Sequence, residues 1–342
     1  MQHDEPRAVT WSEFESIFVN TLQIDEKWSL QGARAVENFG SPMAHAFIWW
    51  PHQLAQEVLC LREGVIEDPY PAPYMEVLVR TRIATCSDEA KAKDWCWQLN
   101  HILSLCSAVW VDHEIQLVAT LCVTPNGRDL IHRLAESALE QIGVAFNAIE
   151  GLMPDADYKL LFTSHPVSGE RREPDEMVDI FRYGAYPSLT QGISLEDAMV
   201  DARDNARSSL IDLGCHAFRA ADEFDVVVTP DGVEVAVAYH PQDAETTRYG
   251  LGVSVDVLMG AVDDFDSPSL LDRVNEITIQ MATTDRTSLM GSVRHMNGSL
   301  FLHSYLTAGY LNRGKRGSVE DLSSLIVNGV IHSFTAWAHC RP

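Results

Sequence analysis

The chain has 342 residues, of which 46% are hydrophobic and 22% are charged, values typical of a globular protein and not of a disordered or fibrous one. Its 49 acidic and 25 basic residues give a formal net charge of −24, which would repel nucleic-acid phosphates and an anionic membrane surface. At ~150 residues per domain, the length predicts two domains. We therefore expect a two-domain globular protein that binds neither nucleic acid nor membrane.

The N-terminus and the cysteines predict the compartment. Residues Met1–Arg7 hold no apolar run of the kind found in a secretory signal. The longest apolar stretches, Phe47–Trp50 and Ile115–Val123, are far shorter than the ~18 residues of a membrane helix. The seven cysteines form no CxxC pair, and most have apolar neighbours, which favours buried reduced thiols and a cytoplasmic location. They are Cys60, Cys86, Cys96, Cys106, Cys122, Cys215 and Cys340.

The first half of the chain predicts a helix, strands, a helix, a hairpin and a long helix. Thr10 and Glu13 form a capping box that begins the first helix. Residues Tyr74–Ala84 alternate between apolar and polar side chains, which is typical of a strand with one buried face. The other elements are expected at Met43–Trp50, Leu59–Arg62, Asp94–Ile102, Ala108–Val111 and Ile115–Val123 (turning near Asp112-His113), and from Leu130 to Phe146.

The second half repeats this order of elements. Ser194–Asp197 resembles a capping box, and Tyr249–Ala261 alternates as a strand does. A hairpin with its turn at Pro230-Asp231-Gly232 precedes that strand. The other elements are a helix at Ser269–Ile277, a hairpin of Ser288–Met296 and Leu300–Leu306 turning at Asn297-Gly298, and a helix at Leu322–Phe334.

The shared order predicts a tandem repeat. We expect a first unit at residues 1–150 and a second at 193–342, each an antiparallel sheet flanked by helices. The connecting segment, residues 151–192, is rich in proline, glycine and charge, and Tyr158–Thr163 is expected to form a short strand within it.

The sequences of both repeats resemble the YbjN-like family. Each has a strand, an acidic turn, a helix with a central asparagine (Asn100 and Asn275), a hairpin and a long final helix. The resemblance covers Tyr74–Ile149 and Ser194–Trp337. It implies an α+β fold of two tandem units like type III secretion chaperones, which together form a pseudo-dimer. It also implies a protein without enzymatic activity that binds another polypeptide, either as a monomeric pseudo-dimer or as a homodimer.

One segment matches the sequence pattern of a phosphate-binding loop. Gly309–Arg316 fits GxxxxGK and precedes a predicted helix. Arg316, however, occupies the place of the magnesium-binding hydroxyl, and the preceding strand belongs to a hairpin and not to a parallel sheet. We interpret the segment as a basic turn and expect no nucleotide cofactor.

The remaining candidate residues for chemistry also favour ordinary structural roles. The register of the second hairpin places His295 and His303 on opposite faces of the sheet, and His332 and His339 on the last helix have no third ligand. The chain has no GxSxG motif, and the apolar neighbours of Cys96 are typical of a core. The same applies to Cys106. We therefore expect no catalytic residue, no metal and no cofactor.

Adjacent apolar residues at Phe47–Pro51 would face both sides of any strand that they form. Val226–Val228 has the same property. Two interpretations stay open: burial against the connecting segment or the other repeat, or a hydrophobic groove for a partner's extended or helical segment. On the second interpretation, Phe47, Trp49 and Trp50 are the partner-binding residues.

Two hypotheses of function follow. The first is a cytoplasmic, non-enzymatic protein that binds another polypeptide, in the manner of a chaperone or adaptor. The alternative is a small-molecule-sensing regulatory protein, or an enzyme, with a site between the two units.

Overall fold

The computed structural model describes residues 7–32, 45–66, 72–128, 130–152, 155–182, 195–220, 224–241, 252–261, 269–283 and 288–307, together with 323, 326, 327 and 329–331. The chain forms two compact units. Unit 1 consists of Met1–Ala92, Val109–Arg182 and Thr284–Met290, and unit 2 of Lys93–Ala108, Tyr183–Thr283 and Gly291–Pro342.

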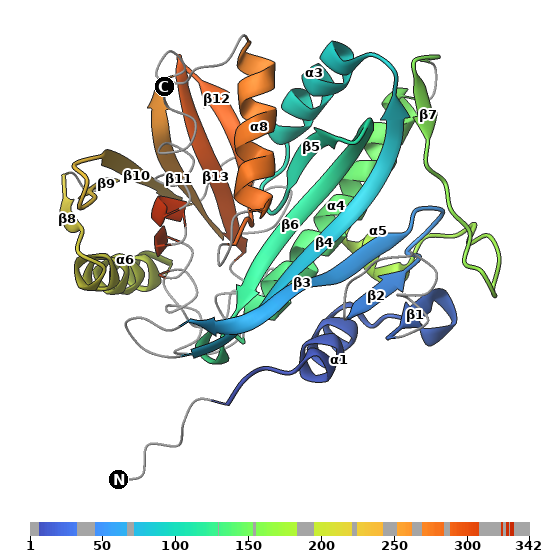
Figure 1. The fold of residues 1–342 in the computed structure, drawn as a ribbon, viewed down its shortest axis with the longest axis horizontal. Coiled ribbons are helices and arrows are strands. Elements are labelled where there is room, and N and C mark those ends of the chain that lie inside the picture. Colours follow the sequence, from blue (N-terminus) through green and yellow to red (C-terminus); the bar gives the residue numbers. More distant parts are fainter. Residues whose placement is uncertain are drawn as a thin grey trace. The chain divides into compact units, whose positions relative to one another are not determined.

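Unit 1 is built on one antiparallel sheet with the strand order β1-β2-β3-β4-β6-β5 (Figure 1). A short strand, β7 (Tyr158–Leu160), pairs with β4 beyond the end of β3. Helices α1 and α4 pack on the same face of the sheet, where Phe18 contacts Phe47 and Gln141 donates to Val79 O. Within the first 182 residues, the bounds are α1 Trp11–Leu22, η1 Glu26–Trp28, β1 Ser29–Gln31, β2 Ala46–Trp49, β3 Gln56–Ile66, β4 Ala72–Cys86, α3 Glu89–Asn100, β5 Ser107–Val111, β6 Glu114–Val123, η2 Pro125–Gly127, α4 Leu130–Leu152 and α5 Glu176–Arg182. Residues 93–100 of α3 and residues 107–108 of β5 belong to unit 2.

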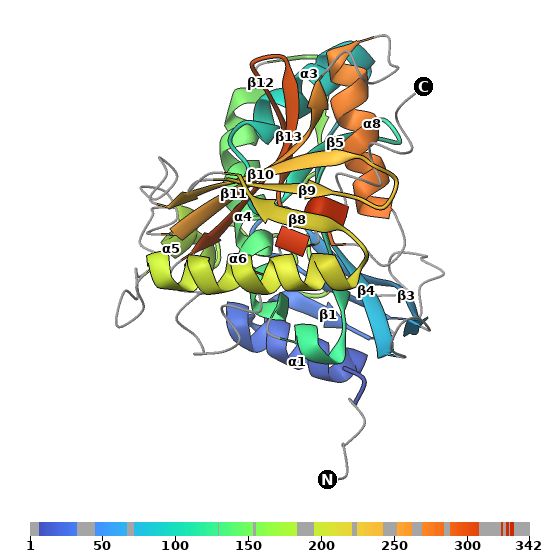
Figure 2. The same ribbon diagram turned by 90° about the vertical axis from the view of Figure 1, so that its left-hand side faces the viewer.

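Unit 2 is built on a second antiparallel sheet with the order β8-β9-β10-β11-β13-β12. Helix α6 contacts the outermost strand, β8 (Figure 2). Ile326 and Val330 of the predicted last helix are helical and buried. The bounds are α6 Leu195–Asp212, β8 His216–Arg219, β9 Phe224–Val228, β10 Glu234–Pro241, β11 Gly252–Ala261, α8 Leu270–Thr283, β12 Ser292–Met296 and β13 Ser299–Thr307.

The two sheets have the same strand order, because in each the sixth strand in sequence lies between the fourth and the fifth. The prediction of an α+β protein with antiparallel sheets is therefore confirmed. That the units are like secretion chaperones remains a prediction.

Local sequence signals set the turns and caps. Thr10 Oγ1 accepts a hydrogen bond from Glu13 N–H at 3.3 Å and begins α1 as its N-cap. Asp112 and His113 both have positive φ, as do Asn297 and Gly298, so both predicted two-residue hairpins form with the expected left-handed turn residues. His295 pairs with Leu300, as the turn at Asn297-Gly298 predicts.

The two asparagines of the resemblance do not occupy equivalent places. Asn100 is the last residue of α3, and its side chain accepts from Ala108 N–H at 2.7 Å and donates to Ala108 O at 3.0 Å. Asn275 lies in the second turn of α8, well before that helix ends. The two asparagines therefore differ in their distance from both ends of their helices.

The compact units do not coincide with contiguous halves of the chain. Residues 93–108 group with unit 2, and residues 284–290 group with unit 1. Described parts of the predicted connecting segment, including β7 and α5, belong to unit 1. The boundaries at residues 150 and 192 delimit repeats in the sequence and remain a prediction in that sense.

Candidate functional site

The three side chains predicted to bind a partner are buried within unit 1. Phe47, Trp49 and Trp50 are only 1%, 0% and 3% exposed. Phe47 packs edge-on against Phe18 of α1, and Trp49 donates its indole N–H to Gln56 Oε1 at 2.7 Å. A partner cannot reach them in this structure, so the prediction of a groove at these residues is corrected to a part of the core.

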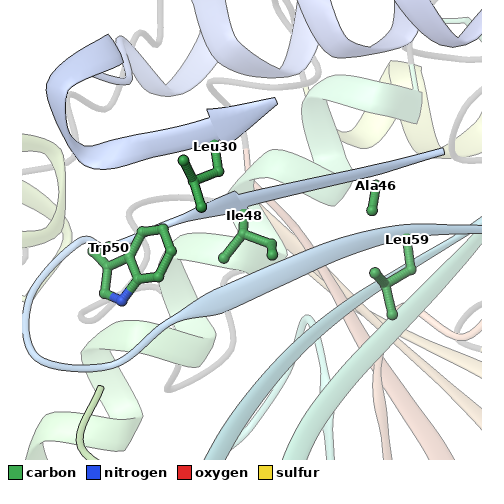
Figure 3. Close-up of a cluster of buried hydrophobic side chains, with 5 residues drawn as sticks. All are labelled: Leu30, Ala46, Ile48, Trp50 and Leu59. Atoms are coloured by element: carbon green, nitrogen blue, oxygen red, sulfur yellow. The ribbon is translucent and has the colours of Figure 1, made fainter. Parts of the chain in front are cut away.

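The opposite face of the same strands carries a second apolar cluster (Figure 3). In Figure 3, Ile48 of β2 lies beside Leu30 of β1, its partner in the strand pairing, with Trp50 on one side of it and Ala46 on the other. Strand alternation places Ile48 and Trp50 on the face turned away from α1 and α4. Apolar residues thus occupy both faces, as the sequence indicated, and both faces need a cover.

The cover on this second face is the segment Leu161–Asp175, which we call the covering segment. Thr163 Oγ1 accepts from the Trp50 indole at 3.2 Å, and the His165 ring packs edge-on against Trp50 at 4.7 Å. Arg171 donates to Trp50 O at 2.8 Å and lies over the Trp28 ring. Burial against the connecting segment, the first of the two interpretations left open by the sequence, is therefore what the structure shows.

Unit 2 contains a row of side chains whose chemistry resembles that of a hydrolase. Ser292, His303 and Asp256 stand side by side on β12, β13 and β11, and His303 Nδ1 lies 2.6 Å from Asp256 Oδ1. The Ser292 hydroxyl, however, donates to Leu103 O at 2.6 Å, so His303 does not receive its proton. All three residues are buried. A nucleophile needs an aligned base and access for a substrate. In this row the Ser292 hydroxyl is not aligned with His303, and burial keeps a substrate out.

The other residues considered for chemistry have structural surroundings. Cys96 and Cys106 are buried, and burial raises the pKa of the Cys215 thiol above its ordinary value, which disfavours a reactive thiolate. Within the described ranges, no three His, Cys, Asp or Glu side chains come together as ligands of a metal ion. The Gly309–Arg316 turn, His332, His339 and Cys340 lie outside the described residues.

A buried ionic cluster holds α6 on one face of the unit 2 sheet. Arg203, which is 1% exposed, donates to Asp225 Oδ1 at 2.7 Å, and Tyr239 donates its hydroxyl to Asp225 Oδ2 at 3.1 Å. Burial, together with the adjacent Asp225 charge, raises the pKa of Tyr239 above its ordinary value and keeps the phenol protonated. Because Asp225 points to α6, its neighbours along β9 point to the opposite face.

On that opposite face, the outer strands of unit 2 carry two exposed aromatic side chains. Phe218 of β8 is 51% exposed and Phe224 of β9 is 37% exposed, and both lie on the face turned away from Asp225. Ile211, at the end of α6, is 55% exposed. A shallow hollow of about 420 Å³ is lined by Ile211, Gly214, Cys215, His216, Ala217 and Phe218. We call β8, this hollow and Phe224 the open edge.

The outer side of β8 also offers main-chain hydrogen-bonding groups. Ala220 N–H donates to Phe224 O at 3.3 Å, which identifies the alternate residues Phe218 and His216 as those that bond to β9. The N–H and C=O groups of Ala217 and Arg219 consequently point away from the sheet. An edge strand with free amide groups and exposed apolar side chains is a template for an added strand.

No pattern in the sequence predicts the open edge. Phe218 and Phe224 flank Asp222 and Glu223, and such a short mixed stretch has no clear period. The available signal was the apolar character of Val226–Val228 on both faces, which indicated that one face of β9 needs a cover.

Comparison of the chain with protein-family models, with curated proteins and with solved structures finds no match in any of the three. Among the described residues, no helix combines the length and apolar composition that crossing a membrane requires.

Proposed function

We propose that this protein binds another polypeptide without chemical change, as an extended segment added along β8 of unit 2. One observation carries the proposal. In unit 1 the chain itself covers the outer strands on the sheet face opposite the first helix. On the corresponding face of unit 2, Phe218 and Phe224 are exposed. The same strand order makes β1 and β8 equivalent positions.

The covering segment of unit 1 illustrates how such a sheet end holds an extended chain. His165 contacts Ser29 O of β1 at 3.3 Å, and Ser168 donates to Lys27 O at 2.7 Å. The backbone takes part as well, since Thr163 N–H donates to Gln53 O at 2.7 Å. These contacts combine main-chain groups with aromatic side chains, which are the two kinds of group that the open edge presents.

Charge and shape together favour one class of partner. Two copies of this chain would each carry a net charge of −24 and would repel one another. A segment of another protein with a net positive charge would be attracted. Its apolar side chains should stand at alternate positions, because residues two apart on a strand face the same side and one of them can fill the hollow beside Phe218.

The test compares peptide binding by the wild type and two variants. Ala217→Pro removes an N–H that has no hydrogen-bond partner among the described residues, and Phe218→Ser removes an exposed apolar side chain. A displayed library of random twelve-residue peptides is selected on the wild-type protein, and the enriched peptides are measured by fluorescence anisotropy. We expect basic peptides with alternating apolar residues, and about tenfold weaker binding to each variant.

Ala217→Val is the matched control, because it keeps the outward N–H and is expected to bind as the wild type does. Peptides that bind all variants equally, or a library that yields no enrichment, would overturn the proposal. So would self-association of the wild type through β8, seen as a doubled mass that Ala217→Pro returns to the monomer.

A further inference from the structure

Each compact unit contains a short piece from the other half of the chain. Unit 2 includes residues 93–108 from the first repeat, and unit 1 includes residues 284–290 from the second. The two pieces have equivalent places in sequence, because both precede a hairpin. Ser104 lies three residues before β5 begins at Ser107, and Leu289 lies three residues before β12 begins at Ser292.

The two pieces are held by equivalent main-chain hydrogen bonds. In unit 1, Thr120 N–H donates to Leu289 O at 2.9 Å; in unit 2, Tyr305 N–H donates to Ser104 O at 3.1 Å. Thr120 is the seventh residue of β6 (Glu114–Val123), and Tyr305 is the seventh residue of β13 (Ser299–Thr307). In each unit, the seventh residue of the hairpin's second strand therefore donates its N–H to the residue three positions before the other half's hairpin. Unit 1 binds the second half in this way, and unit 2 binds the first half.

Side chains reinforce the exchange in unit 1. Leu289 N–H donates to Thr120 Oγ1 at 2.9 Å, so this pair makes two hydrogen bonds. Cys122 N–H donates to Ser288 Oγ at 2.9 Å, and Arg133 of α4 donates to Met290 O at 3.0 Å. Leu289 and Met290 are 0% and 5% exposed, so residues of the second half are part of this unit's interior.

The reciprocal contacts in unit 2 are at least as extensive. Arg294 donates to Leu103 O at 2.7 Å and to Asn100 O at 3.1 Å, and Ser292 Oγ donates to Leu103 O at 2.6 Å. Lys93 of α3 pairs with Asp272 at the start of α8, and that hydrogen bond, together with one from Ser269, lowers the pKa of the Asp272 carboxyl. Leu103 and Ser104 are fully buried.

We propose that the two halves of this chain form an obligate pair, in which the β6 and β13 strands each carry a docking surface for the loop that precedes the other half's hairpin. The occupant of each surface is the complementary half of the same chain. A half by itself would lose the partner of the Thr120 or Tyr305 N–H and the burial of Leu289 or Leu103, and the exposure of buried apolar side chains to water is unfavourable. The two repeats therefore behave as subunits that happen to be covalently joined, and this inference is independent of the open edge.

The test cuts the folded full-length protein at a protease site inserted between residues 183 and 194. The fragments are then examined by native mass spectrometry, and their dissociation constant is measured by dilution. We expect one complex with one copy of each fragment, which separates only in denaturant. Fragments that separate in buffer, or that precipitate after the cut, would overturn the proposal, as would a complex with two copies of each fragment.

Isosteric variants separate this pairing from general stability. Ser107 Oγ donates to Gly291 O at 2.6 Å and Ser292 Oγ to Leu103 O, so the double variant Ser107→Ala/Ser292→Ala removes two hydrogen bonds between the halves within unit 2, one donated by each half. We expect its fragment dissociation constant to rise about tenfold. Ser323→Ala is the control, because Ser323 Oγ donates to Ala202 O at 3.0 Å within the second half. Equal effects of the variant and the control would contradict the proposal.

Discussion

Glu15 on α1 illustrates how partial burial acts on a single ionisable group. Burial raises the pKa of its carboxyl above the ordinary value of 4.5, and the neighbouring His45 opposes that rise. A carboxyl whose pKa is higher in the folded chain than in the unfolded chain contributes stability below its unfolded pKa. That contribution is lost as the pH rises through the folded pKa. At neutral pH the ionised Glu15 is therefore a small net cost to folding.

Glu15→Gln should raise the melting temperature at pH 7, by on the order of 1 °C because the side chain is only partly buried. The difference from the wild type should disappear at pH values below the unfolded pKa, where both side chains are neutral. Differential scanning calorimetry across this range gives the measurement, with the exposed Glu173→Gln as control. A lower melting temperature at pH 7 would show that the His45 interaction outweighs burial.

At the scale of an element, the end of α1 contains an avoidable strain. Gln23 caps the helix with φ 51° and ψ 41°, while its N–H donates to Val19 O, so it adopts the left-handed conformation that favours glycine. The residue is exposed, and its side chain has no hydrogen bond within the described residues.

Gln23→Gly should increase the free energy of unfolding by about 0.5 kcal/mol, because relief of the left-handed strain exceeds the extra backbone entropy of glycine in the unfolded chain. Chemical denaturation measures this change. Gln23→Ala is the control that keeps a Cβ at the same position and should bring no gain. A decrease with glycine would mean that the backbone entropy dominates.

Elements of regular period were predictable from the sequence, and the reason is physical. Tyr74–Ala84 alternates because one face of β4 packs on the core, and Thr10 is the N-cap of α1 because the helix needs acceptors for its first N–H groups. The role of Phe47–Trp50 was not predictable in the same way. Its apolar character required a cover on both faces of the strand. The cover could be a distant segment of the same chain or a partner protein, and no local signal distinguishes the two, because the segment that covers Trp50 lies more than 100 residues further along the chain.

At the scale of the whole molecule, the net charge is the main electrostatic feature. A net charge of −24 over 342 residues makes the folded chain repel itself, and dissolved salt screens that repulsion over ~10 Å at 0.1 M. Local ion pairs such as Lys91 with Asp155 and Asp157 act in the opposite sense, but they lie at the surface. Surface pairs of this kind contribute little to the free energy of unfolding.

The melting temperature should therefore rise as sodium chloride is increased from about 0.01 M to 0.3 M, because screening relieves the repulsion. Thermal denaturation followed by circular dichroism at constant pH checks this prediction, with an equal osmolarity of a neutral solute as control. A fall in melting temperature would mean that the surface ion pairs matter more than the net charge.

The sequence by itself determined the order of helices and strands, the hairpin turns and the presence of two similar halves, because each depends on residues that are near one another in the chain. Only the tertiary structure decided that Phe47, Trp49 and Trp50 are core, that β8 is open, and that Leu289 and Ser104 belong to the opposite half's unit. These features depend on which distant segment packs against a given surface. Apolar burial is non-directional, so composition alone does not specify the partner.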